Sequence, residues 1–256
     1  GIGLALAERA VAEERTVLLV ARTAETLAAA RAAVEAEAKG AGRVLTLALD
    51  VTVADAPDLI AEALRRHGLY ADIVVNNAGI GLGGEFVGNA PDAIDRLIAL
   101  NVAALTRLTR YFLPDMCVRG RGGIINISSL GGYGPGPFQA AYYASKAYVT
   151  SLTRAIAHET RGLGVRVVTV APGPVETLFH ARMRAGTAFY RYFIPGQSPD
   201  AVARAAWRGY RWGQRIVLPG LVAPVLALAM KVSPAILAVP IIAILLRPRG
   251  GENARS

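Results

Sequence analysis

The sequence contains few of the residues that bind metals or form disulfides. There is one cysteine, Cys117, and the three histidines, His67, His158 and His180, are far apart in the chain. A single cysteine excludes an internal disulfide and is typical of a reducing compartment. Histidines without neighbouring ligands do not form a metal site. We therefore expect no bound metal and a cytoplasmic location, with or without association with a membrane.

Acidic residues are also scarce. The chain has 19 acidic and 28 basic residues, a net charge of +9, and lysine occurs only at Lys39, Lys146 and Lys231. This excess of arginine is typical of a compositional preference with solvated helix faces, and the alternative is attraction to anionic lipid or to a phosphorylated cofactor. No basic stripe with interleaved aromatic residues accompanies a nucleic-acid-reading motif, so we expect no nucleic-acid partner.

Short β-branched segments alternate with helical segments along most of the chain. Strands are expected at 16–20, 43–49, 72–76, 123–128 and 165–170, followed by a short last strand at 216–218. This alternation predicts an α/β fold with a doubly wound parallel sheet and helices on both faces. Neither an internal repeat nor a low-complexity linker divides it. We expect one domain over residues 1–219 and a hydrophobic extension over 220–256.

Residues 174–197 interrupt the alternation of strands and helices. They mix aromatic residues and arginines. Two interpretations have equal weight: a lid over an apolar pocket, or a surface excursion that packs on its own aromatic residues. After this segment, Ser198 is expected to cap a helix that continues to about residue 212.

The residues with the clearest chemistry are Tyr142 and Lys146. They are four positions apart in a helical segment, so the phenol and the ammonium share one face. A nearby positive charge favours the phenolate form of tyrosine, which suits Tyr142 to proton exchange. Ser129 precedes the pair by 13 residues, at the end of an expected strand.

Several short motifs, taken together, carry a family resemblance. They are Gly1-Ile2-Gly3, Asn76-Asn77-Ala78-Gly79, Asn101, Ser129, Tyr142 with Lys146, and Pro172-Gly173-Pro174-Val175-Glu176-Thr177. This set, in this order, resembles the short-chain dehydrogenase/reductases over residues 1 to about 219. The resemblance implies a Rossmann-type fold and nicotinamide-dependent carbonyl/alcohol chemistry. It also implies a homodimer or homotetramer, formed through the long helices expected at 91–119 and 140–161.

The resemblance assigns a catalytic role to four residues. Tyr142 would be the general acid that protonates a carbonyl oxygen as hydride arrives. Lys146 would favour the phenolate and hold the ribose of the nicotinamide. Ser129 would hydrogen-bond the substrate oxygen, and Asn101 would hold a water that links Lys146 to solvent. Without the resemblance, Ser129 could cap a strand, Asn101 could be an exposed helical residue, and Tyr142 could be half-buried packing.

The N-terminal residues resemble the end of the family's phosphate-binding turn. Gly1, Ile2 and Gly3 match the last part of Thr-Gly-x-x-x-Gly-x-Gly, in which glycines let the backbone approach a pyrophosphate at a helix N-terminus. The first half of the turn and the strand before it are absent. We therefore expect an N-terminally truncated fragment that lacks the first strand. A bare Gly-x-Gly is otherwise only a loop before a helix.

Arg22 indicates which nicotinamide cofactor is used. It follows the second family strand directly, and Ala21 stands where a carboxylate would bind a free 2′-hydroxyl. A guanidinium binds a 2′-phosphate bidentately, so Arg22 favours NADP(H) over NAD(H). The alternative is an ordinary surface arginine.

Other expected cofactor contacts follow the ends of later strands. By resemblance the adenine, the riboses and the nicotinamide side would be contacted by Asp50, Val51, Asn77, Ala78, Gly79, Pro172, Gly173, Val175 and Thr177. Each has a local alternative. Asp50 could cap a strand end, the Asn-Asn-Ala-Gly run is also a turn signal, and Thr177 could be a helix N-cap.

Residues 216–246 are almost entirely apolar. Lys231 divides them into two runs of about 15 residues, each shorter than the roughly 20 needed to cross a bilayer. Three interpretations remain: an interfacial membrane element, a hydrophobic cover over the substrate pocket or dimer surface, and a spanning helix. Family members with such tails act on lipophilic ketones or acyl chains, an analogy that points to lipid metabolism.

These observations predict an NADP(H)-dependent oxidoreductase that reduces a carbonyl of a hydrophobic substrate. The carbonyl would belong to a ketone, an aldehyde or a 3-ketoacyl group. A serine hydrolase is excluded, because Ile127 precedes Ser128 and Ser129 and no Gly-x-Ser-x-Gly elbow exists. The remaining alternative is a non-catalytic or weakly active Rossmann-fold protein that binds at a membrane.

Overall fold

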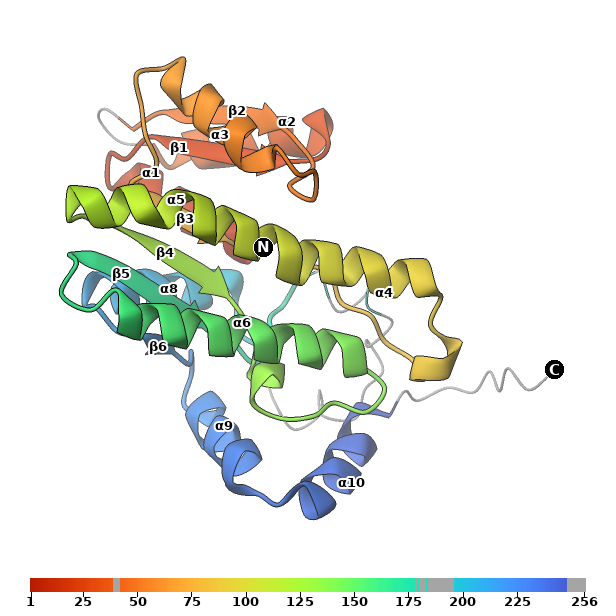
Figure 1. Cartoon of the computed structure of the whole chain (residues 1–256). Helices are drawn as coiled ribbons and strands as arrows, with labels where there is room; N and C mark the ends of the chain where they lie inside the picture. Colours follow the sequence, from red (N-terminus) through yellow and green to blue (C-terminus); the bar gives the residue numbers. More distant parts are fainter. Residues whose placement is uncertain (39–41, 178, 180–182, 184–195, 248–256) are drawn as a thin grey trace.

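The computed structural model describes residues 1–38, 42–177, 179, 183 and 196–247 (Figure 1). The strands are β1 Val17–Ala21, β2 Val44–Ala48, β3 Ile73–Asn76, β4 Gly122–Ile127, β5 Val165–Val170 and β6 Ile216–Val217. The helices are α1 Ile2–Ala12, α2 Ala24–Ala36, α3 Ala56–Arg65, α4 Pro91–Ile98, α5 Leu105–Arg119, α6 Ala140–Glu159, α8 Pro199–Arg211, α9 Val222–Val232 and α10 Ala235–Leu246.

All described strand pairs are parallel, as predicted, but the sheet is in two parts. Strands β1 and β2 form one pair, and the other part has the order β3-β4-β5-β6. In the classic doubly wound order a further strand lies between these two parts. Among the described residues no strand occupies that position, so β1 and β3 are not hydrogen-bonded to each other.

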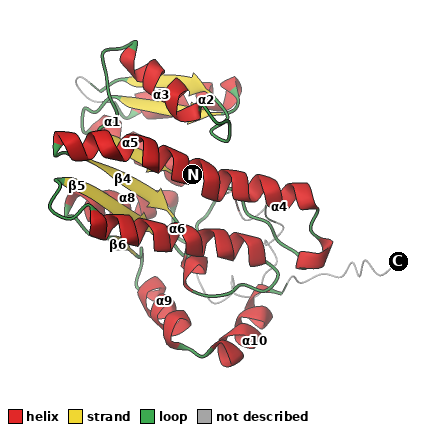
Figure 2. Ribbon diagram, viewed as in Figure 1, coloured by secondary structure: helices red, strands yellow, loops and turns green. Residues whose placement is uncertain are grey.

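Helices cover both faces of the four-stranded part (Figure 2). On one face α1 and α8 bury Leu6, Val202 and Trp207 against β4 and β5. On the other face α5 and α6 pack against the same strands, with Phe112 and Met116 in the core. Strands covered on both faces are mostly apolar, and β4 is buried from Gly123 to Ile127 with Asn126 as its one polar side chain.

One long helix expected from the sequence is interrupted at its middle. The predicted helix 91–119 consists of α4 and α5 joined by a π-helical turn, Ala99–Ala104, which contains Asn101. Such turns are rare and occur often at functional sites. The predicted cap of α8 is confirmed, because the Ser198 hydroxyl accepts a hydrogen bond from the Ala201 amide at 3.1 Å.

The apolar tail forms the two helices α9 and α10, which diverge from each other below the sheet in Figure 1. Helix α9 lies against the turn Leu130–Tyr133 that follows β4. In the part of the chain that is described, no helix combines the length and the hydropathy that a membrane crossing requires.

A buried polar layer crosses the sheet beneath the ends of its strands. Asn76, Asn126 and Thr169 are neighbours in the parallel register of β3, β4 and β5. The side-chain amide nitrogen of Asn76 donates to the side-chain oxygen of Asn126 at 2.8 Å and to the Thr109 hydroxyl of α5 at 3.1 Å. The Asn126 amide donates to Thr153 of α6 at 2.9 Å. These bonds connect the sheet to the two helices on this face.

We expect Asn126→Ala to lower the free energy of unfolding by about 2–4 kcal/mol, because it leaves a cavity and removes the acceptor of a buried Asn76 N–H. Urea denaturation followed by circular dichroism measures the change. The matched control is Asn89→Ala on a partly exposed loop, where a loss of less than about 0.5 kcal/mol is expected. Equal effects at both positions would contradict the stabilising role of this layer.

Candidate active site

A large cleft opens at the carboxyl ends of β3, β4 and β5. Its volume is about 1100 Å³. Twelve of the sequence-predicted site residues line it: Gly1, Ile2, Asn77, Ala78, Gly79, Ser129, Tyr142, Lys146, Pro172, Gly173, Val175 and Thr177. Ligands bind at this edge in open α/β sheets. The fold therefore brings together most of the residues that the sequence separates by up to 176 positions.

Lys146 is buried in this cleft and is held by the sheet. Its side chain lies 5.9 Å from the centre of the Tyr142 ring, and both residues are buried on the same face of α6. The Lys146 ammonium donates a hydrogen bond to the Ile127 carbonyl at 2.9 Å. Burial disfavours the charged form and lowers the pKa of Lys146 from 10.5 to about 8.

The backbone of α6 is fixed to the end of β4 next to Lys146. The Ser128 hydroxyl donates to the Lys146 carbonyl at 2.9 Å and lies 2.6 Å from the Thr150 hydroxyl. Gly132 allows the close approach, since a Cβ there would lie 2.6 Å from the Thr150 hydroxyl and 2.7 Å from the Lys146 carbonyl oxygen. The height of α6 above the strand is thus determined, and with it the position of Lys146.

Ser129 is the last extended residue before a short 3₁₀ turn. Its hydroxyl oxygen accepts a hydrogen bond from the Gly131 amide at 3.1 Å. The sequence-based alternative is a strand cap, whereas the structure shows Ser129 as the N-cap of the turn Leu130–Tyr133. In this bond the Ser129 oxygen uses a lone pair, so its O–H can still donate a hydrogen bond to a group in the cleft.

Asn101 is 1% exposed, so the alternative of an exposed helical residue is wrong. Its side-chain amide donates to the Ile80 carbonyl at 2.8 Å and to the Ser145 hydroxyl at 3.1 Å, and its oxygen accepts from the Ile80 amide at 2.9 Å. These bonds join the π-helical turn to the loop after β3 and to α6. A water-holding role for Asn101 stays a prediction.

The glycine at position 79 separates Asn101 from Lys146. A Cβ there would lie 3.2 Å from the Asn101 side-chain oxygen and 3.5 Å from the Lys146 ammonium. The first distance is tight for a side chain that is held by other hydrogen bonds, and the second is an ordinary van der Waals contact. The backbone after β3 therefore passes directly beside the two polar groups.

Helix α1 begins at the cleft. Gly1 and Ile2 line the cleft, and a Cβ at Gly3 would lie 2.5 Å from the Asn77 side-chain nitrogen. The absence of a side chain at Gly3 therefore lets the start of α1 approach the loop after β3 closely. The first amide groups of a helix have no partner within it and carry partial positive charge, which suits them to an anion.

Four predicted cofactor or catalytic residues do not line the cleft, in addition to Gly3: Arg22, Asp50, Val51 and Asn101. The Asp50 carboxylate accepts from the Thr52 amide at 2.9 Å and from the Thr52 hydroxyl at 2.7 Å. These two bonds, and to a smaller extent the charge of Arg22, lower the pKa of Asp50. The strand-end cap is thus observed, and Asp50 and Arg22 lie near each other at the ends of β2 and β1.

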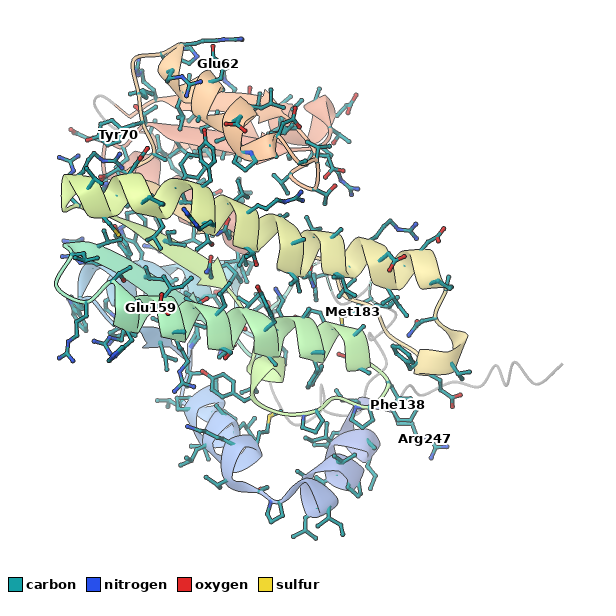
Figure 3. The ribbon with its side chains drawn as sticks, in the orientation of Figure 1. Glu62, Tyr70, Phe138, Glu159, Met183 and Arg247 are labelled. Carbon is teal, nitrogen blue, oxygen red and sulfur yellow. The ribbon has the colours of Figure 1, made fainter. Side chains whose placement is uncertain are left out.

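The cleft has an apolar wall from two parts of the chain. The predicted lid at 174–197 lies mostly outside the described residues, but its described first residues, 174–177, line the cleft, and so do Phe179 and Met183. Phe179 lies 5.6 Å from Tyr142 between ring centres. Met183, labelled in Figure 3, packs with Leu97 and Tyr142. The two ends of the segment are held together, because Glu176 and Gln197 share a backbone hydrogen bond of 2.9 Å.

The tail helices complete this wall. From α9 and α10 the cleft is lined by Leu226, Ala229, Met230, Ala238, Ile241, Ile242, Leu245 and Leu246. Of the sequence-based interpretations of the tail, a cover over the pocket is thus the one seen in the structure. Between the lid residues and the tail, the cleft is apolar on the side away from the strands.

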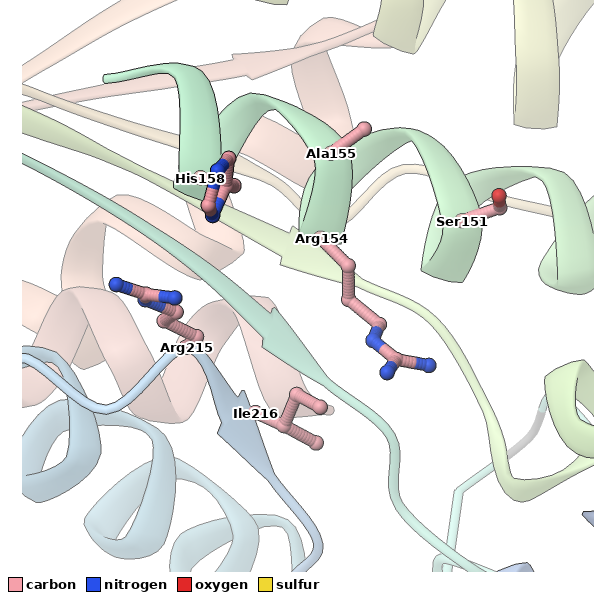
Figure 4. Close-up of a pocket in the computed structure, with 6 residues that line it drawn as sticks. All are labelled: Ser151, Arg154, Ala155, His158, Arg215 and Ile216. Carbon is pink, nitrogen blue, oxygen red and sulfur yellow. The ribbon is translucent and has the colours of Figure 1, made fainter. Parts of the chain in front are cut away.

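A second and smaller pocket, of about 440 Å³, lies between α6 and β6 (Figure 4). Arg154 and His158 of α6 face Arg215, which precedes β6. None of its lining residues lines the large cleft. It is basic, and it lies beside the strand that leads into α9.

Sequence reasoning missed the residues that support the site. Four such residues are buried and hydrogen-bonded, but none is assigned a role by a motif: Asn126, Ser128, Ser145 and Thr150. The available signal was polarity inside apolar elements: Asn126 interrupts a buried strand, and buried polar groups need partners.

Comparisons with known proteins find similar sequences over most of the chain. The family model described as short chain dehydrogenase matches residues 1–188. A ketoacyl reductase, HetN, of Nostoc sp. is 33% identical over 176 residues, which are 69% of this chain and 60% of that protein. The chain therefore spans less than two thirds of that relative.

Solved structures of similar fold include proteins with either nicotinamide cofactor. A short-chain dehydrogenase from Sphingobium yanoikuyae in complex with NADPH is 28% identical, with a TM-score of 0.75 over 99% of this chain and 95% of that chain. A 3-oxoacyl-[acyl-carrier protein] reductase from Brucella melitensis with bound NAD is 26% identical, with a TM-score of 0.70 over 85% of both chains.

The buried Lys146 predicts a specific dependence of stability on pH. Its pKa is about 8 in the folded protein and about 10.5 without burial, so between these values the unfolded state binds more protons. The free energy of unfolding should rise with pH in this window, by at most about 1.4 kcal/mol per pH unit. Below pH 8 both states are protonated and the contribution of Lys146 is constant.

The measurement is urea denaturation of the wild type and of Lys146→Met between pH 7 and 10. Other titrating groups contribute equally to both proteins, so the difference between them reports Lys146. The free energy of unfolding of the wild type minus that of Lys146→Met should increase as the pH rises through 8. Parallel curves would show that Lys146 titrates as it does in the unfolded chain.

Proposed function

This chain belongs to the short-chain dehydrogenase family, and we propose that it is an NADP(H)-dependent oxidoreductase that reduces the carbonyl of a hydrophobic substrate to an alcohol. The single observation that carries the proposal is the arrangement of Ser129, Tyr142 and Lys146 around one cleft. The cleft is polar beside the strands and apolar beside the tail. The polar side therefore suits a carbonyl oxygen, and the apolar side suits a hydrocarbon chain.

The chain's own residues supply the proton and the orientation. A nicotinamide cofactor, when bound, supplies the hydride. Tyr142 donates its phenolic proton to the carbonyl oxygen, so that a C–H and an O–H bond form as the C=O double bond becomes single. Ser129 donates a hydrogen bond to the same oxygen and stabilises its developing charge. The product is an alcohol, and Tyr142 is left as a phenolate.

Lys146 stabilises that phenolate and restores its proton. The Lys146 ammonium has three N–H donors, and only one is used by the Ile127 carbonyl. Since burial lowers the pKa of Lys146 to about 8, the group can release a proton near neutral pH. Asn101 holds the neighbouring loop in place, and a water beside it would connect Lys146 to solvent.

The residues around the start of α1 fit a dinucleotide. Gly1 and Gly3 let the backbone approach a pyrophosphate, and the helix N-terminus opens on the cleft. Arg22 would hold a 2′-phosphate at the end of β1, where the neighbouring Asp50 carboxylate is occupied by Thr52. NADP(H) is therefore favoured over NAD(H), although both occur among the similar structures.

The substrate is a ketone or a 3-ketoacyl group on a hydrocarbon chain. Aliphatic residues of α9 and α10 line the cleft, and Phe179 and Met183 lie against Tyr142. A similar protein is named as a ketoacyl reductase and another as a 3-oxoacyl reductase. These names support an acyl chain as the hydrophobic part of the substrate.

The functional form is a homodimer or homotetramer that associates through α5 and α6. These helices lie side by side in Figure 1, joined by a hydrogen bond of 3.1 Å between the Thr106 and Tyr148 hydroxyls. Their outer face exposes Tyr111, Val118 and Tyr148. An exposed apolar face of this kind suits contact with a second copy.

Tyr142→Phe removes the proposed acid and keeps the ring. We expect kcat for ketone reduction to fall by about 10²–10⁴-fold, with unchanged binding of NADPH measured by fluorescence. The matched control is Tyr143→Phe, since the next tyrosine also lines the cleft but has Ala147 four positions on. Tyr143→Phe should keep most of the activity. Full activity of Tyr142→Phe on every accepted ketone would refute the assignment.

Arg22→Asp tests the cofactor. A carboxylate repels a 2′-phosphate and can bind a free 2′-hydroxyl, so the ratio of kcat/KM for NADPH to that for NADH should reverse. Arg43→Asp is the control, because Arg43 precedes β2 and so lies at the opposite end of the same parallel strand pair. That variant should leave the ratio unchanged. An unchanged ratio for Arg22→Asp would remove the basis for preferring NADP(H).

A further inference from the structure

The tail helices α9 and α10 are apolar on both sides. Their inner side lines the active-site cleft. Their outer side exposes Leu221, Val222, Val225, Leu228, Val232, Ile236, Leu237 and Ile244, of which Leu221 is 93% and Ile236 83% exposed. A helix that is hydrophobic all round is stable in water only when its outer side is also covered.

The stretch of sequence that contains the tail carries charge of one sign, although Arg204 and Arg211 of α8 form ion pairs with Asp200 and Glu13. Residues 201–251 contain no aspartate or glutamate, but seven basic residues: Arg204, Arg208, Arg211, Arg215, Lys231, Arg247 and Arg249. Lys231 lies in the last turn of α9 and Arg247 follows α10, so basic side chains flank the apolar outer face. The basic pocket at Arg154 and Arg215 lies beside the strand that leads into α9 (Figure 4).

We propose that α9 and α10, here called the tail hairpin, dock this outer face into an anionic lipid bilayer surface, and that the cleft beneath receives its substrate from the bilayer. The hairpin would lie in the interface without crossing it. Helices of 11 and 12 residues are about 17–18 Å long, little more than half of a hydrocarbon core.

Charge decides between a bilayer and a second copy of the chain. A twofold contact through the tail hairpin would bring Lys231 and Arg247 of one copy toward the same basic residues of the other. An anionic lipid surface is complementary to both the apolar face and its basic flanks. Lysine and arginine at such positions keep their charge at the headgroups while their stems lie along apolar surface.

The second half of the proposal rests on the proposed function. The residues facing the cleft, such as Leu226, Met230 and Ile242, lie on the same two helices as the outer residues. A hydrocarbon chain that leaves the bilayer along the hairpin therefore stays in apolar contact until its carbonyl meets Tyr142 and Ser129. The substrate class is a membrane-partitioned long-chain ketone or 3-ketoacyl lipid.

Vesicle co-sedimentation tests the docking without any activity measurement. The protein is mixed with vesicles of phosphatidylcholine alone, or of phosphatidylcholine with phosphatidylglycerol. We expect binding to the anionic vesicles that weakens at high salt and is at least about tenfold weaker on neutral ones. The double variant Leu228→Glu/Ile236→Glu should lose this binding, because it places two carboxylates on the outer face. Neither position lines the cleft.

The control is Val87→Glu/Leu163→Glu, which adds the same charges at positions 90% and 46% exposed outside the tail. It should bind anionic vesicles like the wild type. Two results would overturn the proposal: equal loss of binding in both double variants, or an absence of vesicle binding with a dimer by light scattering that only the tail variant dissociates. The second result would identify the outer face as a contact between copies.

Reduction of a long-chain ketone carried in anionic vesicles tests the delivery. The tail variant should lose at least tenfold in kcat/KM for this substrate and keep the wild-type rate on a short-chain ketone in solution. An equal loss on both ketones would contradict delivery from the bilayer. A protein that reduces neither ketone would refute the proposed function, whereas the co-sedimentation result would still decide the docking.

Discussion

The geometry of the site depends on the attachment of α6 to the end of β4. Two opposite contacts make it: the Lys146 ammonium donates to the Ile127 carbonyl, and the Ser128 hydroxyl donates to the Lys146 carbonyl. A buried ammonium is costly unless it is hydrogen-bonded, so this lysine cannot easily leave its position. Since Tyr142 lies one turn earlier on the same helix, fixing Lys146 also fixes the phenol. The same burial lowers the pKa of Lys146, so structural restraint and proton exchange have one cause.

The polar layer below the strand ends extends this restraint through the sheet. Asn76 and Asn126 bond to each other and, through Thr109 and Thr153, to the two helices of that face. A slip of one residue between β3 and β4 would leave amide groups in the apolar core without partners. The layer thus determines the register of the strands whose next residues form the cleft. Asn101 fixes the loop after β3 in a similar way, because its side chain bonds to both the amide and the carbonyl of Ile80.

The sequence allowed much of this to be predicted where a local rule applies. The alternation of strands and helices follows from hydrophobic pattern, and the cap at Ser198 from its position before a proline. The π-helical turn around Asn101 has no comparable signal, because it depends on contacts with Ile80 and Ser145. Asp50 shows the limit of motif reasoning. Its carboxylate bonds to Thr52, a contact that two residues of spacing allow but do not require.

The tail presents a conflict that neither pattern nor packing resolves alone. A cover over an apolar cleft needs only its inner side to be hydrophobic. A polar outer side would be well solvated and would not change the side that lines the cleft. Instead, large aliphatic residues stand on the outer face, while acidic residues are absent from the surrounding 51 positions of the sequence. Compositional preference for arginine explains an excess of positive charge but not an exposed Leu221 or Ile236. Both features are expected together only where the outer face meets a surface that is apolar within and negative at its edge.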